Sequence, residues 1–380
     1  MAGTRHHYIP RFLQAGFNSR PGERTQWGWL YRKGKLAPVE ATLKHVSVEG
    51  SFYRYKTLDT YSSADAAITR AEAARLAPLV RRLRGMNVGP CADDMGVGEL
   101  FAHIYARTRA SWEYVESQAS ALISRIETFT GDPEAIRRIL PALIEAQRPV
   151  IRKLLAPRYP GQDIDMLLTQ TVAQIEIVTP EALTGDVARV IDPLVGYSLQ
   201  VVQKTKVRSM QELSEKPEIA RRFHDCAFHV LEFDGARLVQ GDTPVVFCKI
   251  DGGFTPITWK DEPFAYAFLP LTPTRVVVAN KIGRPDSWEV LREASIRCSY
   301  QHFIAAAPYA ELDSLAHLIG AEFPAITQLQ IERLFEEALA LACTLGWLGV
   351  DEMTALEYLV PKVLPPLEDA EVSAAGDSDE

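Results

Sequence analysis

The stretch FAYAFLPLTPTRVVVA, residues 264–279, carries the clearest β-strand signal in the chain. Two apolar runs, rich in aromatic and β-branched residues, flank a Thr-Pro turn, and this is the pattern of a β-hairpin. Upstream, residues 228–233 and 236–239 flank an Asp234-Gly235 pair, which also favours a tight hairpin turn. We therefore expect a β-sheet in this part of the chain.

Helical patterns surround this predicted sheet. Residues 62–225 hold successive apolar patterns with a helical period, separated by short Gly and Pro breaks, and residues 286–318 continue as helix. The first 60 residues look extended, with an aromatic run at residues 27–31 before a Lys-Gly-Lys turn. The sequence thus predicts an α+β fold that is predominantly helical, with a small mixed or antiparallel β-sheet formed by the N-terminal segment and residues about 228–280.

The expected organisation is one large domain with a tail. We expect residues 1–365 to form a single α+β domain with a helical insertion or subdomain at about 62–225, and residues 366–380 to be a disordered acidic tail. The net charge is −8, and residues 368–380 hold six acids and no base, so the rest of the chain is nearly neutral. The net charge of the chain does not indicate a nucleic-acid partner, but a local basic patch would be enough to bind nucleic acid.

Several protein classes are disfavoured by the sequence. The 5 cysteines are scattered and form no CxxC pair, which argues against a zinc ribbon and a secreted disulfide scaffold. There is no apolar run long enough to span a membrane and no secretory signal at the start, so we expect a cytoplasmic protein with no membrane partner. The sequence also lacks the P-loop, GxGxxG, GxSxG and HExxH motifs.

The start of the chain gives the best lead to function. A histidine pair precedes a proline, an arginine and an apolar ladder, in the run His6-His7-Tyr8-Ile9-Pro10-Arg11-Phe12-Leu13 with Phe17. The pair could be a tag remnant, or one core and one exposed histidine, or it could supply a metal ligand or general base. Adjacent residues of an extended segment point to opposite faces, so at most one histidine faces a given site. A site here requires residues 5–17 to be buried against the strands of residues 236–280.

Two further residues are candidates for the same site. Arg107 lies near the apolar stripe of a predicted helix, where it could pair with an acid or bind a phosphate or carboxylate. Asp242 lies between two apolar runs in Gly241-Asp242-Thr243-Pro244. It could bond its own turn, or it could deliver a carboxylate from a strand end into a central cleft as an orienter, base or metal ligand.

Several motifs follow one another in a fixed order: the N-terminal run given above, Trp29-Leu30-Tyr31, Phe52-Tyr53, Glu72, Arg107, Gly241-Asp242-Thr243-Pro244 and Pro270-Leu271-Thr272-Pro273. This order resembles that of the bacterial family catalogued as domain of unknown function 4238. The resemblance spans roughly residues 5–310, and Gly241 stands where the family has serine. It implies a shared fold and a candidate constellation, and it implies no activity.

The first functional hypothesis is a metal-assisted hydrolase or nuclease that acts on a phosphate-bearing substrate or nucleic acid, with bacterial defence as its setting. In this hypothesis His7, Glu72 and Asp242 hold one divalent metal whose bound water is the nucleophile. Arginine side chains would clamp the phosphate. The full set of candidate catalytic residues is His6, His7, Arg11, Glu72, Arg107 and Asp242.

The alternative hypothesis is a non-catalytic binding or regulatory module. The same polar residues would then form a buried network that ties the N-terminal segment to the sheet, and the helical region would bind a protein partner. An enzyme needs these side chains to converge on an open cleft, whereas a structural network is closed and matches each donor with an acceptor.

Overall fold

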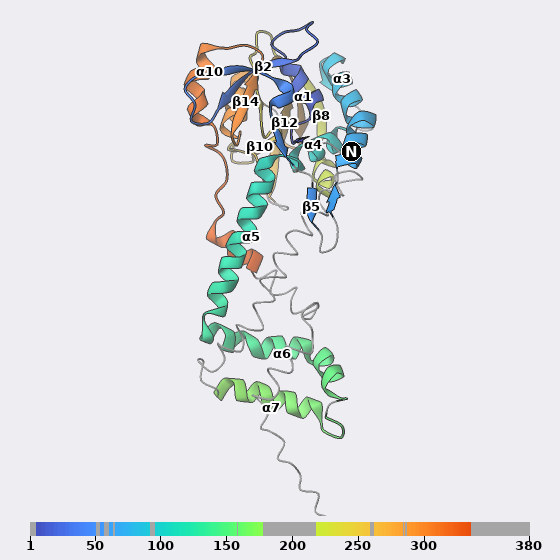
Figure 1. The fold of residues 1–380 in the computed structure, drawn as a ribbon, viewed down its shortest axis with the longest axis vertical. Coiled ribbons are helices and arrows are strands. Elements are labelled where there is room, and N and C mark those ends of the chain that lie inside the picture. Colours follow the sequence, from blue (N-terminus) through green and yellow to red (C-terminus); the bar gives the residue numbers. More distant parts are fainter. Residues whose placement is uncertain are drawn as a thin grey trace, which may run out of the picture. The chain divides into compact units, whose positions relative to one another are not determined.

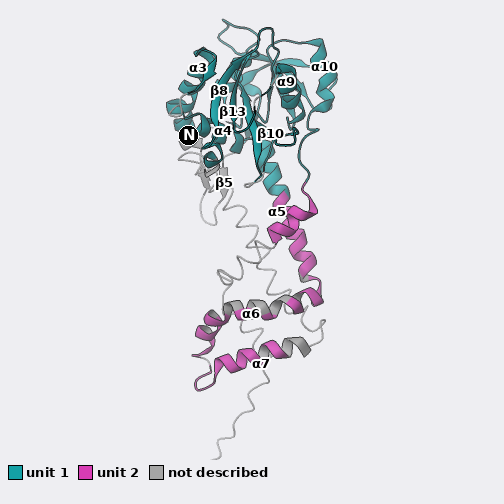
Figure 2. Cartoon of the chain, turned by 180° about the vertical axis from the view of Figure 1, so that it is seen from behind, with its two compact units in different colours: residues 1–117, 203–325 teal, residues 118–202, 326–380 magenta. Residues whose placement is uncertain are grey.

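The computed structural model describes residues 5–50, 54–56, 61–63, 65–91, 96–157, 159–177, 218–258, 262–283, 285 and 287–335. The chain divides into two compact units, shown in different colours in Figure 2. The first unit is Met1–Ser117 with Gln203–Ala325, and the second is Gln118–Val202 with Ile326–Glu380. The expected helical insertion at 62–225 overlaps both units, and the expected tail at 366–380 lies outside the described residues.

A six-stranded antiparallel sheet forms the centre of the first unit (Figure 1). The hairpin expected at residues 264–279 is present as its two middle strands, with Phe268 opposite Val278. In spatial order the strands are β11 (Phe254–Thr255), β10 (Val246–Lys249), β12 (Phe264–Pro270), β13 (Arg275–Asn280), β8 (Ala227–Glu232) and β7 (Gly89–Pro90).

Both faces of this sheet are buried, which explains why its strands are almost continuously apolar. Alternate residues of one strand belong to different cores: Val277 faces one cluster, while Val276 and Val278 face the other. The first cluster includes residues of helices α3 (Ala77–Gly85) and α4 (Val97–Ala106). The second includes residues of helix α9 (Trp288–Arg297).

A second sheet of four antiparallel strands lies in the same unit. Its spatial order is β3 (Val39–Thr42), β2 (Trp27–Arg32), β14 (His302–Ala305) and β9 (Gln240–Gly241). Strand β14 is central and buried along its whole length, and Tyr31 stacks on Phe303 with ring centroids 4.5 Å apart. Helix α10 (Ala310–Leu315) and the short helix η6 (Ala316–Leu318) pack on this region.

The N-terminal motif forms its own short elements. Strand β1 (Arg5–His7) pairs with β4 (Val48–Gly50), and the chain continues into helix α1 (Arg11–Gln14) and a 3-10 turn, η1 (Ala15–Phe17). Tyr8, Ile9 and Leu13 are buried in the first core cluster together with residues of β10 and β12. This confirms the expectation that the segment packs against the strands between residues 236 and 280.

The remaining described elements of the unit are the 3-10 turn η2 (Leu43–His45), the β5–β6 pair (Arg54–Lys56, Tyr61–Ser63), helix α2 (Asp65–Ala71), a π-helical turn (Glu72–Leu76) and η5 (Glu218–Phe223).

Arg84 fastens helix α1 to the rest of the core. Its guanidinium donates to the backbone carbonyls of Phe12 at 3.0 Å, Leu13 at 2.9 Å and Leu271 at 3.0 Å. Gly16 allows this close approach, because a Cβ there would lie 1.9 Å from the Leu271 carbonyl oxygen. One arginine on α3 therefore holds the N-terminal helix against the Pro-Leu-Thr-Pro turn.

The second unit is helical in its described part. Helix α5 (Arg109–Thr130) starts in the first unit and continues into the second, followed by α6 (Pro133–Leu155) and α7 (Ile164–Ile177). Asp132 caps α6 by accepting from the backbone N–H groups of Glu134 and Ala135, as expected for Asp before Pro at a helix start. Leu155, Ile164 and Leu168 form the buried contact between α6 and α7.

The expected fold class was wrong in its proportions. The protein is a mixed α+β structure with antiparallel sheets of six, four and two strands, not a predominantly helical protein with one small sheet. The N-terminal segment pairs with β4 and does not join the sheet of residues 228–280. The second large sheet was missed because β14 is only four residues long and buried throughout, so periodicity cannot distinguish it from the helices on either side.

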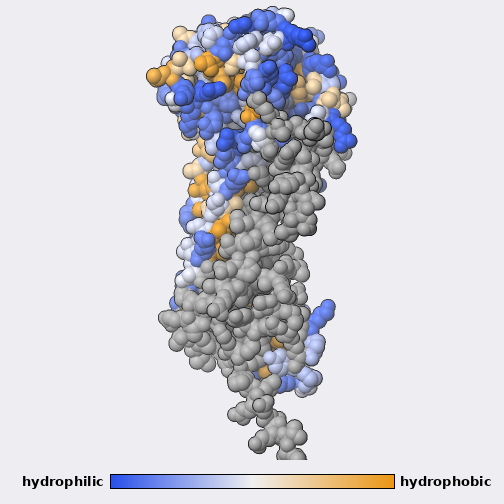
Figure 3. Space-filling model, in the orientation of Figure 1, coloured by the Kyte–Doolittle hydropathy of each residue, from blue (hydrophilic) through white to orange (hydrophobic). Residues whose placement is uncertain are grey.

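None of the described helices is long and apolar enough to cross a membrane. On the face of the first unit drawn in Figure 3, hydrophilic side chains predominate and hydrophobic ones are scattered among them.

Candidate functional site

The pairing of β1 with β4 fixes which residues lie opposite the side chains of the N-terminal motif. His6 lies opposite Glu49, and His7 lies opposite Val48. The next step of this register brings Tyr8 beside Ser47, whose carbonyl oxygen accepts from the Tyr8 backbone N–H at 3.0 Å. The Tyr8 ring lies edge-on to the His302 ring, with centroids 6.5 Å apart.

Ser47 is the first member of a buried triad that it forms with His302 and Asp242. The Ser47 hydroxyl oxygen lies 2.9 Å from His302 Nε2, and His302 Nδ1 lies 3.4 Å from Asp242 Oδ2. The three side chains come from the loop before β4, from β14 and from the end of β9. Ser47 is 5% exposed, His302 8% and Asp242 2%.

The Asp242 carboxylate also organises the turn that leads into β14. It accepts the backbone N–H groups of Tyr300 at 2.6 Å, Gln301 at 2.8 Å and His302 at 3.3 Å. The Asp242 N–H donates to the His302 carbonyl at 3.0 Å, which fixes the two residues side by side. The aspartate therefore has a structural role as well as a position next to the imidazole.

Burial sets the protonation of the triad. It lowers the pKa of His302 below the ordinary value of 6.5, against the effect of Asp242, so the imidazole is neutral at pH 7. Burial also raises the pKa of Asp242, while His302 and the three backbone N–H groups act in the opposite direction. The donor and acceptor roles of Ser47 and His302 depend on the tautomer: with the proton on Nδ1, the side that faces Asp242, Nε2 can accept a proton from Ser47.

Ser47 has an unusual backbone conformation. Its φ is +54°, and it is the one non-glycine residue in the described part of the chain with a positive φ. Such conformations cost about 1–3 kcal/mol and cluster at functional sites. The conformation places Ser47 at a sharp turn between the 3-10 turn η2 and strand β4.

A second polar group, the arginine cluster, consists of Glu72, His103 and Arg107. Arg107 forms an ion pair with Glu72, lies 3.1 Å from His103 Nε2 and donates to the His7 carbonyl oxygen at 2.6 Å. Arg107 is 2% exposed, and it caps the end of α4 where the chain breaks before α5. Glu72 begins the π-helical turn, a local geometry that is frequent at functional sites.

The structure divides the predicted site residues between these two groups. Glu72 and Arg107 contact each other, and Arg107 also reaches the backbone of His7, whereas Asp242 belongs to the buried triad. His6 is buried on β1, and Arg11 is exposed on α1. Among the described residues, no group of three or more His, Cys, Asp or Glu side chains is placed to hold a metal ion, so His7, Glu72 and Asp242 do not form one ligand set.

Sequence reasoning missed Ser47 and His302. Their side chains meet across 255 positions of sequence, and no local motif surrounds either residue. Ser47 stands inside the short extended run of residues 45–49, and this pattern gives no reason to expect a positive φ. His302 was hidden because residues 286–318 were interpreted as helix.

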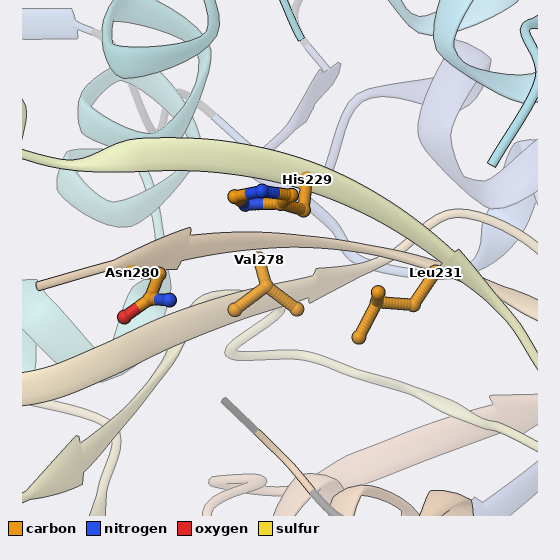
Figure 4. A pocket seen from close by; sticks show the side chains of 4 residues that line it. All are labelled: His229, Leu231, Val278 and Asn280. Atoms are coloured by element: carbon orange, nitrogen blue, oxygen red, sulfur yellow. The ribbon is translucent and has the colours of Figure 1, made fainter. Parts of the chain in front are cut away.

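Two hollows lie elsewhere in the first unit. A small cavity of about 80 Å³ opens on the six-stranded sheet between β8 and β13, lined by His229, Leu231, Val278 and Asn280 (Figure 4). A larger groove of about 520 Å³ lies along α3 and the start of α4 and is lined by Arg75, Leu76, Pro78, Leu79, Arg82, Gly96 and Glu99. Neither contains a residue of the buried triad.

Comparison with known proteins gives no match: no family model, curated protein or solved structure is similar enough to the chain. The resemblance to the family of unknown function therefore stays a prediction, and function has to be argued from the geometry of this chain.

Proposed function

We propose that the first unit is a hydrolase of the serine type, with the buried triad as its reaction centre. The observation that carries the proposal is the connected order Ser47–His302–Asp242, in which one imidazole nitrogen meets a serine hydroxyl and the other meets a carboxylate. This arrangement is recognised by its geometry and occurs on unrelated folds in any chain order. The positive φ of Ser47 and the neutral state of His302 add support.

The chemistry is acyl transfer to the serine and then to water. Ser47 Oγ forms a bond to the acyl carbon of an ester or amide while its proton passes to His302 Nε2. His302 gives this proton to the leaving group as the bond to the acyl carbon breaks. Water then attacks the acyl-serine, with His302 as the base, and the acid product and free Ser47 result. Asp242 orients the imidazole and stabilises its protonated form.

The predicted metal-assisted reaction has weaker support. Its three proposed ligands are divided between the buried triad and the arginine cluster, and the described residues offer no alternative ligand set. The hydrolase class is kept in our proposal, and the serine hydroxyl replaces a metal-bound water as the nucleophile.

Turnover of p-nitrophenyl esters of increasing acyl length tests this proposal. Ser47→Ala and His302→Gln should each lower kcat by at least about 10³-fold, because members of a triad act as one unit. Ser299→Ala is the matched control, since Ser299 is also buried and its hydroxyl donates to the Ser295 carbonyl outside the triad. Equal turnover by the wild type and Ser47→Ala would overturn the proposal.

A second candidate is a non-catalytic binding module in which the same contacts are structural. Two observations favour it: three backbone hydrogen bonds give the Asp242 carboxylate a complete structural role, and the three side chains are buried and line neither of the two hollows. A closed network of this kind fits a structural role, whereas catalysis requires that a substrate can reach Ser47. In that case Asp242→Asn should lower the melting temperature, and no variant of the triad should change ester turnover relative to the wild type.

A further inference from the structure

The small cavity on the six-stranded sheet is built from two neighbouring strands. His229 and Leu231 of β8 and Val278 and Asn280 of β13 line it, and its volume is about 80 Å³. His229 lies directly opposite Val278 in the register of the two strands. Figure 4 shows the imidazole of His229 close to Val278, with Asn280 and Leu231 on opposite sides of this pair. The cavity therefore has a polar end and an apolar end.

The polar end holds a hydrogen-bond acceptor that the protein leaves unused. Asn280 Oδ1 is buried and has no hydrogen-bond partner among the described residues. Such atoms are uncommon in native proteins, because they lose their hydrogen bonds to water without replacement. The neighbouring Lys281 points elsewhere, since its Nζ lies 4.7 Å from the centroid of the Phe264 ring. A ligand that donates to Asn280 would supply the missing hydrogen bond.

The lining residues suit neither water nor an ion. A buried water molecule typically makes about three hydrogen bonds, whereas the described lining offers two polar side chains, His229 and Asn280. None of the described lining residues is an Asp, Glu, Lys or Arg, so an ion would be buried without an opposite charge. The lining therefore favours an uncharged molecule that has apolar surface and one donor group.

The size and shape of the cavity narrow the class of ligand. An apolar cavity of about 150 Å³ accommodates benzene, so this smaller cavity has room for a smaller molecule. The imidazole of His229 also offers a flat aromatic surface for a planar ring.

We propose that the cavity binds the ring of a small uncharged heterocycle with one N–H group, such as an azole. The N–H donates to Asn280 Oδ1, and the carbon edge of the ring contacts Val278 and Leu231. The site contains no residue of the buried triad, so the inference does not depend on the proposed hydrolase function.

Titration of the full-length protein with pyrazole tests the proposal. The methyl signals of isotope-labelled valine report on binding, because Val278 lines the cavity. Furan is the matched probe, since it is also a planar five-membered ring but has no N–H group. Pyrazole should shift the Val278 methyl signals in a saturable way, and furan should bind at least about tenfold more weakly, the effect of one lost hydrogen bond.

Asn280→Leu separates the hydrogen bond from the packing of the ring. Leucine has a similar size and lacks the acceptor, so the variant should bind pyrazole about tenfold more weakly than the wild type and bind furan equally well. Asn87→Leu is the matched control and should keep the wild-type affinity for both probes, since Asn87 is exposed and does not line the cavity.

Two results would overturn the proposal: no saturable shift of Val278 in the wild type, or equal affinities of the wild type for pyrazole and furan. Both are measured on the wild type, so they decide the proposal even if Asn280→Leu does not fold.

Discussion

At the scale of single residues, His302 makes the stability of the protein depend on pH. Its pKa is lowered by burial in the folded state and returns to about 6.5 on unfolding. The groups that face it are Asp242, Ser47 and Tyr8, with Arg32 opposite it in strand β2. Because the folded pKa is the lower one, the stabilising contribution is present above about pH 6.5 and is lost as pH falls through the folded pKa.

We therefore expect His302→Gln to flatten the pH dependence of the unfolding free energy below about pH 6.5. Each tenfold difference in proton affinity between the folded and unfolded states corresponds to about 1.4 kcal/mol. Chemical denaturation at a series of pH values measures the effect, with the exposed His317→Gln as control. Asp242 has a raised pKa and acts in the opposite direction, so Asp242→Asn should be measured alongside. Parallel curves for wild type and His302→Gln would contradict the expectation.

Arg84 should be one of the most important single residues for stability. Burial lowers its pKa to about 10, so it remains charged at pH 7 while its guanidinium serves three backbone carbonyls. Arg84→Met removes this shared donor from the three carbonyls, and we expect a loss of about 3 kcal/mol. Arg81→Met, on the exposed side of the same helix, should cost less than about 0.5 kcal/mol. Equal midpoints of urea unfolding for the two variants would contradict this role for Arg84.

At the scale of elements, the sequence predicted best where the signal is local. Helix α6 begins at Pro133 after its Asp132 cap, and the hairpin of β12 and β13 turns at the Thr-Pro pair, both as expected. The hairpin expected around Asp234-Gly235 was wrong. Strand β8 pairs with β13 and β7, while residues Gln240–Gly241 pair with β14. Strand β8 therefore pairs with the longer apolar strand β13 and not with the short segment that follows the Asp-Gly turn. A pairing between strands far apart in the sequence leaves no pattern in the residues near either strand.

The arginine cluster should hold strand β1 in place. Arg107 is tied to Glu72 and to the His7 carbonyl, so Arg107→Met removes the anchor between α4 and the N-terminal strand. Hydrogen exchange of the amides in residues 5–8 should become at least about tenfold faster, because local opening of β1 becomes easier. The control Arg75→Met removes an ion pair with Glu99 that is about half exposed, and exchange in β1 should not change. Unchanged exchange in Arg107→Met would show that β1 is held by other contacts.

At the scale of the whole molecule, the site could not be predicted because it is assembled from separated parts of the chain. The sequence indicated an α+β fold and singled out Asp242 and the N-terminal run, and both lie at the buried triad. The pairing of β14 with β2 and β9 could not be predicted from the sequence. This pairing brings His302 to Ser47 and Asp242. Fold-scale pairings of this kind depend on the packing of complete sheets, whereas periodicity describes one element at a time.

The first unit should fold without the second. The core clusters around both of its sheets consist only of residues of the first unit, and the α6–α7 contact consists only of residues of the second. A chain in which a flexible Gly/Ser linker of about 20 residues replaces 118–202, ending at residue 325, should melt cooperatively and keep its ester turnover. Aggregation or loss of a cooperative transition would show that the second unit is needed for folding.

The most direct test of the central claim is the mass of the Ser47 peptide after exposure to a fluorophosphonate. If Ser47 is a nucleophile activated by His302, the wild type gains one phosphonyl group on Ser47, located by fragmentation of the peptide of residues 45–54. The adduct should be absent in Ser47→Ala and at least about 10²-fold slower to form in His302→Gln. An unmodified Ser47 in folded wild-type protein, or labelling at the same rate in His302→Gln, would contradict the claim.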